Sequence, residues 1–301
     1  MIHVTDTFSD IPQAFPQGKF SMEGWKAYIQ RYFGENRSLF EKDLEEYLSS
    51  GDYSFERDFL PVLQAVWDNP RLEVLHQHFQ AVTDQLNQRL LDRFGREMDV
   101  EVVLYLGLCN GAGWAVQLDG KDHVLIGVEK VLELGWETLP AMQGLVYHEL
   151  GHLYHGQHGR LHQPVNSGPQ KFVWQLFTEG VAMCFEQEMV GDPDFFQQDQ
   201  GGWQDWCREH FPSILEDFDR DLPGMDRFQQ RYFGDWVRYQ GWGDVGYYLG
   251  ARFVRELLST VSFDQVIQLS LEEVCRLYRQ FVSSHLHRDS LLPAGEGGTA
   301  F

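Results

Sequence analysis

The segment GLVYHELGHLYHGQHG, from Gly144 to Gly159, constrains the fold more than any other part of this sequence. His148 and His152 are four residues apart, and residues four apart lie one turn above each other on the same face of an α-helix. A different face carries the apolar residues Val146, Leu150 and Leu153 of the segment, together with Met142 just before it. The segment therefore predicts a helix with one face in a hydrophobic core and one polar face.

The polar face of this helix carries the pattern HExxH, which predicts a metal site. Two imidazoles one turn apart can both bind a single zinc ion, and Glu149 beside them can act as a general base toward water. The alternative interpretation is an exposed helix face that happens to be rich in histidine. The chain contains 12 histidines, so the pattern alone does not decide between the two.

A catalytic zinc ion needs three protein ligands and one open position. Glu179 is one candidate for the third ligand, because a helix hairpin could bring it across to His148 and His152. The second candidate is His158, which gives the spacing HExxHxxxxxH and resembles the metzincin pattern HExxHxxGxxH. Here His155 occupies the place of the glycine that lets the metzincin chain turn back.

Three further histidines lie near the motif. His155 lies about 10 Å along the helix axis from His148, too far for both to bind one ion on a straight helix. We therefore expect His155, His158 and His162 to be exposed to solvent or to support the metal ligands from behind.

Composition limits the possible partners. The net charge of -21 would repel phosphate backbones and anionic membrane surfaces, so nucleic acid and membranes are not expected as partners. The sequence has no apolar run of about twenty residues and no basic start followed by an apolar stretch, so we expect a cytoplasmic protein. The 4 cysteines are widely spaced and are expected to be reduced thiols.

Periodicity predicts a predominantly helical α+β chain. Helices are expected over 21–48 with a break at 34–36, over 55–67, and from Pro70 to a stop at Gly95. Short strands are expected over 100–108, 114–118 and 123–128, with a hairpin turn at Asp119-Gly120. The motif helix should run from about Thr138 to His155, and further helices should cover 172–189, 203–218, 248–261 and 263–285.

Three regions are expected along the chain. Residues 1–97 form a helical region packed on a catalytic core, residues 98–286 form the catalytic domain, and residues 287–301 form a flexible tail. A small β-sheet before the HExxH helix would complete the catalytic domain.

Two segments after the motif give the chain a resemblance to a known family. The run LFTEGVAMCFE, from Leu176 to Glu186, resembles the second motif of gluzincin peptidases of the aminopeptidase N and leukotriene hydrolase type. Tyr247-Tyr248-Leu249-Gly250-Ala251 resembles the Tyr-x-x-Gly-Ala helix start of the same enzymes. The chain also resembles the DUF2268-type predicted zinc-dependent proteases, which combine HExxH with a distant EGxA and a GY-x-x-G helix.

The resemblance implies a zincin-like catalytic domain that binds one zinc ion through His148, His152 and Glu179. It also implies that Glu149 is the general base and that Tyr247, with Tyr248 as the alternative, stabilises the tetrahedral intermediate. The expected function is zinc-dependent hydrolysis of a peptide or protein substrate. The alternatives are a metzincin-like peptidase that uses His158 and an inactive zincin-fold protein that binds peptides.

The sequence also departs from these families. Thr178 replaces the asparagine that precedes the glutamate ligand, and the segment around Gly111–Ala115 lacks the glutamate of the aminopeptidase GxMEN strand. The resemblance therefore does not extend to aminopeptidase activity. Met183 replaces the aspartate that follows the glutamate ligand in thermolysin, so another group must orient the imidazoles.

Overall fold

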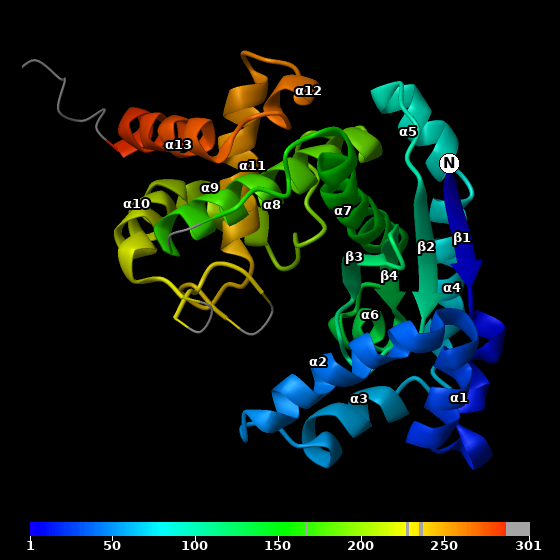
Figure 1. Cartoon of the computed structure of the whole chain (residues 1–301). Helices are drawn as coiled ribbons and strands as arrows, with labels where there is room; N and C mark the ends of the chain where they lie inside the picture. The colour runs from blue at the N-terminus through cyan, green and yellow to red at the C-terminus, as the bar shows by residue number, and fades with distance from the viewer. Residues whose placement is uncertain (166–167, 227–228, 235–236, 287–301) are drawn as a thin grey trace, which may run out of the picture. The chain divides into compact units, whose positions relative to one another are not determined.

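The computed structural model describes residues 1–165, 168–226, 229–234 and 237–286. The predicted tail, 287–301, lies outside the described residues. The chain divides into two compact units. Unit 1 comprises Met1–Gln157 and Phe185–Gln197, and unit 2 comprises His158–Cys184 and Gln198–Phe301. Helices predominate and one small sheet is present, which confirms the predicted α+β class (Figure 1).

Unit 1 contains a four-stranded sheet with the order β1-β2-β4-β3. Strand β1 pairs in parallel with β2, β2 pairs in parallel with β4, and β3 pairs antiparallel with β4. Asp119 and Gly120 both have positive φ, 49° and 75°, as the hairpin turn between β3 and β4 requires. The strands span Ile2–Asp6 (β1), Val100–Tyr105 (β2), Gly113–Leu118 (β3) and Lys121–Gly127 (β4).

Strand β1 was not predicted, because the first hundred residues were expected to be helical apart from their loops. Its burial pattern explains this result. Of its five residues only Ile2 is buried, so the strand shows no alternation between an apolar and a polar side. It is held by backbone pairing with β2, almost a hundred residues later, which sequence periodicity does not report.

The helices of unit 1 follow the predicted pattern with four differences, of which the first is α6, a helix over Val128–Leu134 that was not predicted. The expected helix over 55–67 is a π-helical turn, Phe55–Phe59, followed by a short helix, and the long helix after Pro70 is interrupted at Asp84-Gln85. The motif helix α7 continues three residues further than expected, to His158. The helices are α1 (Met22–Phe33), α2 (Arg37–Ser49), α3 (Leu60–Gln64), α4 (Pro70–Thr83), α5 (Leu86–Phe94), α6 (Val128–Leu134) and α7 (Leu139–His158).

The core of unit 1 lies where helices cover the sheet. Trp25 of α1 is fully buried, and its indole N–H donates to the carbonyl of Leu106 just after β2, at 2.9 Å. The predicted core face of α7 is confirmed, because Met142, Val146 and Leu150 have no exposed surface and Leu153 is 8% exposed. Helix α7 is thus held by its apolar side, which leaves its polar side for chemistry.

Helix α8 spans Gly168–Val190, and its last turns belong to unit 1. There, Phe185 stacks on Phe94 of α5 with ring centroids 4.5 Å apart, and its ring centroid lies 5.2 Å from that of Tyr154 on α7. The guanidinium of Arg89 on α5 donates to the carbonyl of Met189 at 3.0 Å and lies over the ring of Tyr147. These contacts fix the last turns of α8, from Phe185 onward, against α5 and α7.

Unit 2 is helical in its described part. Helices α8 and α11 approach so closely that a Cβ atom on Gly180 would lie 2.2 Å from the carbonyl oxygen of Gly250. Glycine at both positions therefore permits backbone contact between the two helices. The other helices of the unit are α9 (Trp203–Glu209), α10 (Phe211–Asp221), α12 (Phe263–Val266) and α13 (Leu271–Leu286), while α11 spans Val245–Leu258.

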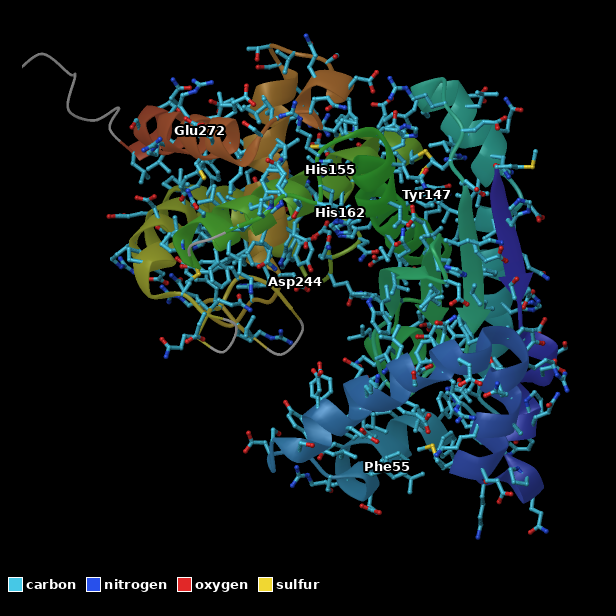
Figure 2. The ribbon with its side chains drawn as sticks, viewed as in Figure 1. Phe55, Tyr147, His155, His162, Asp244 and Glu272 are labelled. Carbon is cyan, nitrogen blue, oxygen red and sulfur yellow. The ribbon has the colours of Figure 1, made fainter. Side chains whose placement is uncertain are left out.

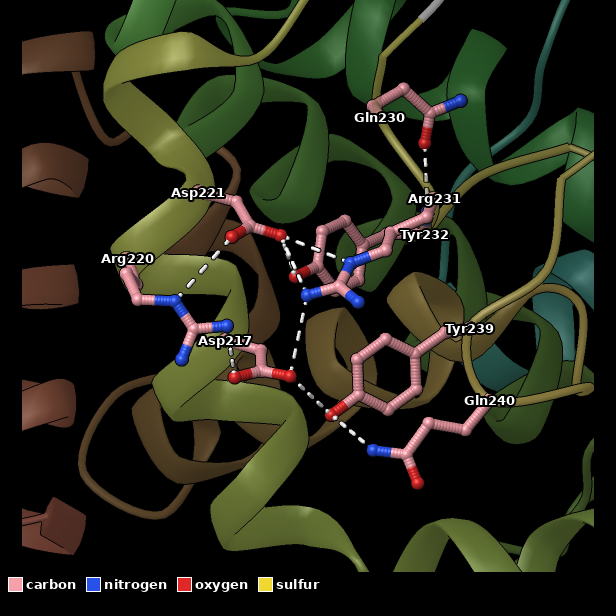
Figure 3. A network of polar contacts seen from close by, with 8 residues as sticks. All are labelled: Asp217, Arg220, Asp221, Gln230, Arg231, Tyr232, Tyr239 and Gln240. Atoms are coloured by element: carbon pink, nitrogen blue, oxygen red, sulfur yellow. Dashed lines mark hydrogen bonds and ion pairs between the residues drawn. The ribbon is translucent and has the colours of Figure 1, made fainter.

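A polar network attaches the segment before α11 to α10 (Figure 3). The guanidinium of Arg231 bridges Asp217 and Asp221 of α10 at 3.3 and 2.9 Å, and it lies over the ring of Tyr239. The hydroxyl of Tyr232 donates to Asp221 at 2.8 Å. The carbonyl of Tyr232 accepts the backbone N–H of Gly246, so the network also supports the first turn of α11.

Two further properties concern the whole described chain. Cys184 and Cys207 are buried, Cys109 and Cys275 are half-buried, and all four are free thiols. Within the described ranges, no helix combines the length and the apolar character that crossing a bilayer would require.

Candidate metal centre

Helix α7 presents the two histidines of the motif as the sequence predicts. His148 is buried and His152 is half-buried. Their Nε2 atoms lie 3.2 Å apart, and the two rings are nearly perpendicular, at 83°. Both imidazoles therefore direct the same ring nitrogen toward one point.

Glu179 of α8 completes a group that could hold a metal ion. His148, His152 and Glu179 each offer one ligand atom, and these three atoms lie within 4.8 Å of one another. This is the predicted set of ligands. Glu179 lies on α8, in the part of that helix that belongs to unit 2.

The spacing of the two nitrogens fits a small tetrahedral ion. Two imidazole nitrogens that bind one zinc ion at about 2.0–2.1 Å in tetrahedral geometry lie about 3.3 Å from each other. The observed separation of 3.2 Å agrees with that value without any movement of α7. Two nitrogens and one carboxylate also match the donor set of a catalytic zinc site, which leaves a fourth position open.

Glu149 is half-buried and lies beside strand β3 of unit 1. A Cβ atom on Gly113, the first residue of β3, would lie 2.9 Å from both Cγ and Oε1 of Glu149. The absence of a side chain at Gly113 thus makes room for the Glu149 carboxylate next to the strand. This places a carboxylate directly after the first histidine and against the outer strand of the described sheet.

Glu186 is a residue of the site that the sequence analysis missed. It is fully buried on α8, and its Oε2 lies 3.4 Å from Nδ1 of His148. Burial raises the pKa of Glu186 above its ordinary value of 4.5, while the His148 side chain and the backbone N–H of Gln197 act in the opposite direction. Its position seven residues after Glu179, on the same helix face, was the available sequence signal.

Gly144 explains how this carboxylate fits against α7. The glycine lies one turn before His148, and a Cβ atom there would lie 3.1 Å from Oε1 of Glu186 and 2.5 Å from Cβ of Gln197. Any larger residue at this position would push Glu186 and the segment after α8 away from the histidine. The first glycine of the motif segment therefore has a packing role beside the site.

Tyr247 lies in the first turn of α11 and is half-buried. Its ring contacts Phe233 with centroids 5.7 Å apart. Tyr248, the alternative, is 3% exposed and packs edge-on against Trp203, and burial raises its pKa. Within unit 2, the contact of Gly180 with Gly250 brings the turn that carries Glu179 next to the turn that follows Tyr247.

The remaining histidines differ from one another. His162, on the segment after α7, is exposed (Figure 2). His158 is half-buried at the end of the helix. His155 has no exposed surface, which excludes the first of the two alternatives expected for this residue, exposure to solvent. Tyr154, the residue before it on α7, also has no exposed surface, so the helix remains buried beyond the turn that carries the motif.

No protein-family model matches the chain, and comparisons with curated proteins and with solved structures found no significant match. The assignment of a function therefore depends on the geometry of the site and on the residue patterns.

Proposed function

We propose that the chain is a zinc-dependent peptidase of the gluzincin type, with a zincin-like catalytic unit. The observation that carries this proposal is the grouping of His148, His152 and Glu179, whose ligand atoms lie within 4.8 Å of one another. The sequence spacing of the motif and the 3.2 Å separation of the two Nε2 atoms support the same conclusion. The substrate would be a peptide or a protein.

The three ligands would hold one zinc ion per chain through two imidazole nitrogens and one carboxylate oxygen. Zinc bound in this way supplies a Lewis acid and lowers the pKa of a bound water molecule. The His148 and His152 rings contribute their Nε2 lone pairs, and Glu179 contributes negative charge that offsets part of the charge of the ion.

Glu149 is the general base in this proposal. Its carboxylate would accept a proton from the attacking water and then pass it to the amine of the departing peptide. The position of the carboxylate beside β3 supports this role, since Gly113 leaves space for it there. A half-buried carboxylate is accessible to water and to substrate.

Tyr247 would donate its hydroxyl proton in a hydrogen bond to the oxyanion that develops on the substrate carbonyl. Its place in the first turn of α11 is supported by Phe233 and by the hydrogen bond from Gly246 to Tyr232. Tyr248 is a weaker candidate, because it is almost fully buried against Trp203.

Strand β3 offers a surface for the substrate. It is the last strand on its side of the described sheet, so its outer backbone groups can pair with an extended peptide. Such a peptide would run past Gly113 and therefore past the Glu149 carboxylate.

The geometry favours Glu179 over His158 as the third ligand. Helix α7 continues without a turn to His158. Ten residues then separate His148 from His158, which corresponds to about 15 Å along the helix axis. One small ion cannot bind both histidines at that distance.

The test is hydrolysis of a peptide library by the zinc-loaded full chain, with products identified by mass spectrometry. Glu149→Gln should keep its zinc and hydrolyse peptides at least about 100-fold more slowly, because the base is lost while the ligands remain. Glu188→Gln, at an exposed position of α8, is the matched control and should behave as the wild type. Equal rates for Glu149→Gln and wild type would refute the proposed base. A zinc-loaded wild type without activity would favour the peptide-binding alternative.

A further inference from the structure

Glu186 is the most deeply buried carboxylate near the metal site, and none of the proposed chemical steps uses it. It has no exposed surface. Removing a carboxylate from water is costly unless a polar or charged partner stabilises it. The side chain that faces it is His148, whose Nδ1 lies 3.4 Å from Oε2.

The two ring nitrogens of His148 therefore face different groups. Nε2 faces Nε2 of His152 at 3.2 Å, on the side of the ligand group, while Nδ1 faces the Glu186 carboxylate. A proton on Nδ1 leaves the lone pair on Nε2 free to bind a metal ion. A carboxylate that accepts this proton fixes both the tautomer and the orientation of the ring.

The surroundings of Glu186 hold the carboxylate in this place. Gly144 provides the space that any Cβ atom would take from the carboxylate. Among the described residues, neither carboxylate oxygen of Glu186 has a hydrogen-bond partner, which leaves both oxygens available to His148. The stack of Phe185 on Phe94 fixes the adjoining residue of α8. The separation of 3.4 Å is longer than a strong hydrogen bond, and such bonds often shorten when a site binds its ligand.

We infer that Glu186 is a positioning residue that orients His148 for metal binding through its Nδ1 proton. This inference rests on the proposed zinc site. Glu186 would orient the imidazole in place of Met183, which has no carboxylate, since Glu186 comes three residues later on the same helix. Glu179 and Glu186, two turns apart, would then act as ligand and as support of a ligand from one helix face.

The test is the affinity of the full chain for Zn²⁺ and Co²⁺, measured by competition with a chelator. Glu186→Gln should bind each ion about 10–100-fold more weakly than wild type, as is typical when a carboxylate behind a histidine ligand is lost. Its Co²⁺ absorption spectrum should shift, because the ring of His148 is no longer held. Glu188→Gln, two residues further on and exposed, should match the wild type in both measurements.

A measurement on the unaltered protein keeps the inference testable if Glu186→Gln does not fold. In the zinc-loaded wild type, the Nδ1 proton of His148 should give a downfield NMR signal that exchanges slowly with water, assigned by its loss in His148→Ala. The exposed His162 serves as the reference for fast exchange.

Two results would overturn the inference while leaving the zinc site intact. One is wild-type affinity and a wild-type Co²⁺ spectrum in Glu186→Gln. The other is an Nδ1 proton of His148 that exchanges as fast as that of His162. A wild-type chain that binds neither ion would instead refute the proposed function, and with it this inference.

Discussion

Glu129 makes the stability of unit 1 dependent on pH. It is 1% exposed in the first turn of α6, and its two carboxylate oxygens accept the backbone N–H groups of Gly107 and Cys109 at 2.9 and 3.0 Å. It thereby anchors the segment that leads from β2 to β3. Burial raises the pKa of Glu129 from its ordinary value of 4.5 to about 7, although these two hydrogen bonds act in the opposite direction.

The sign of the effect follows from this raised pKa. Between pH 4.5 and 7 the folded chain retains a proton on Glu129 that the unfolded chain has lost. The contribution of Glu129 to stability is therefore complete below pH 4.5 and is lost as the pH rises through 7. The difference between the two pKa values, at about 1.4 kcal/mol per pKa unit, corresponds to about 3.5 kcal/mol.

The assay is urea denaturation of wild type and of Glu129→Gln at several pH values from 5 to 8.5. Glutamine has a similar shape and no charge, so the variant lacks this pH dependence. The stability of Glu129→Gln relative to wild type should increase by about 2.5 kcal/mol from the acidic to the alkaline end, because part of the contribution is already lost at pH 5. A difference between the two proteins that stays constant with pH would refute the reasoning.

Two further substitutions test unit 2, one its helix packing and the other a helix cap. Gly180→Ala should destabilise the protein by about 1–3 kcal/mol, because its Cβ atom would lie 2.2 Å from the carbonyl oxygen of Gly250. The assay is urea denaturation, and an unchanged free energy of unfolding would contradict this close packing. Ser262→Ala should cost about 1 kcal/mol, because Ser262 and Gln265 form a capping box at the start of α12. Thermal denaturation should then show a lower Tm, and an unchanged Tm would mean that the cap contributes nothing.

The parts of the fold that could be predicted depend on local signals. The Asp119-Gly120 turn, the stop at Gly95 and the apolar face of α7 are set by neighbouring residues, and each was found where it was expected. The break at Asp84-Gln85 was missed because Val82 and Leu86 are both buried and the helical period continues across it.

Two features of the fold were missed for different reasons, the boundary between α9 and α10 and the strand β1. The expected helix over 203–218 is two helices, and Pro212 in the first turn of α10 indicated the boundary. Strand β1 gave no signal, since its pairing with β2 depends on contacts across most of unit 1. The boundary between α9 and α10 could therefore have been predicted from Pro212, whereas local sequence carries no information on β1.

The candidate site also contains residues that could be predicted from local sequence and one residue whose role depends on packing. His148 and His152 follow from their four-residue spacing on a helix, and the grouping with Glu179 was predicted from the expected helix hairpin and from the family resemblance. For Glu186 the sequence offered only its spacing from Glu179, because its partner His148 is determined by the packing of the last turns of α8 on α7.

The measurement that tests the central claim most directly is the zinc content of the purified chain by mass spectrometry, after incubation with Zn²⁺ and removal of the excess. Wild type and Glu188→Ala should each hold about one zinc ion per chain, and Glu179→Ala should lose it, because a catalytic site needs three protein ligands. His158→Ala should keep its zinc, since α7 carries that residue too far along the helix. A wild-type chain that holds no zinc, or a Glu179→Ala variant that holds as much as wild type, would contradict the account.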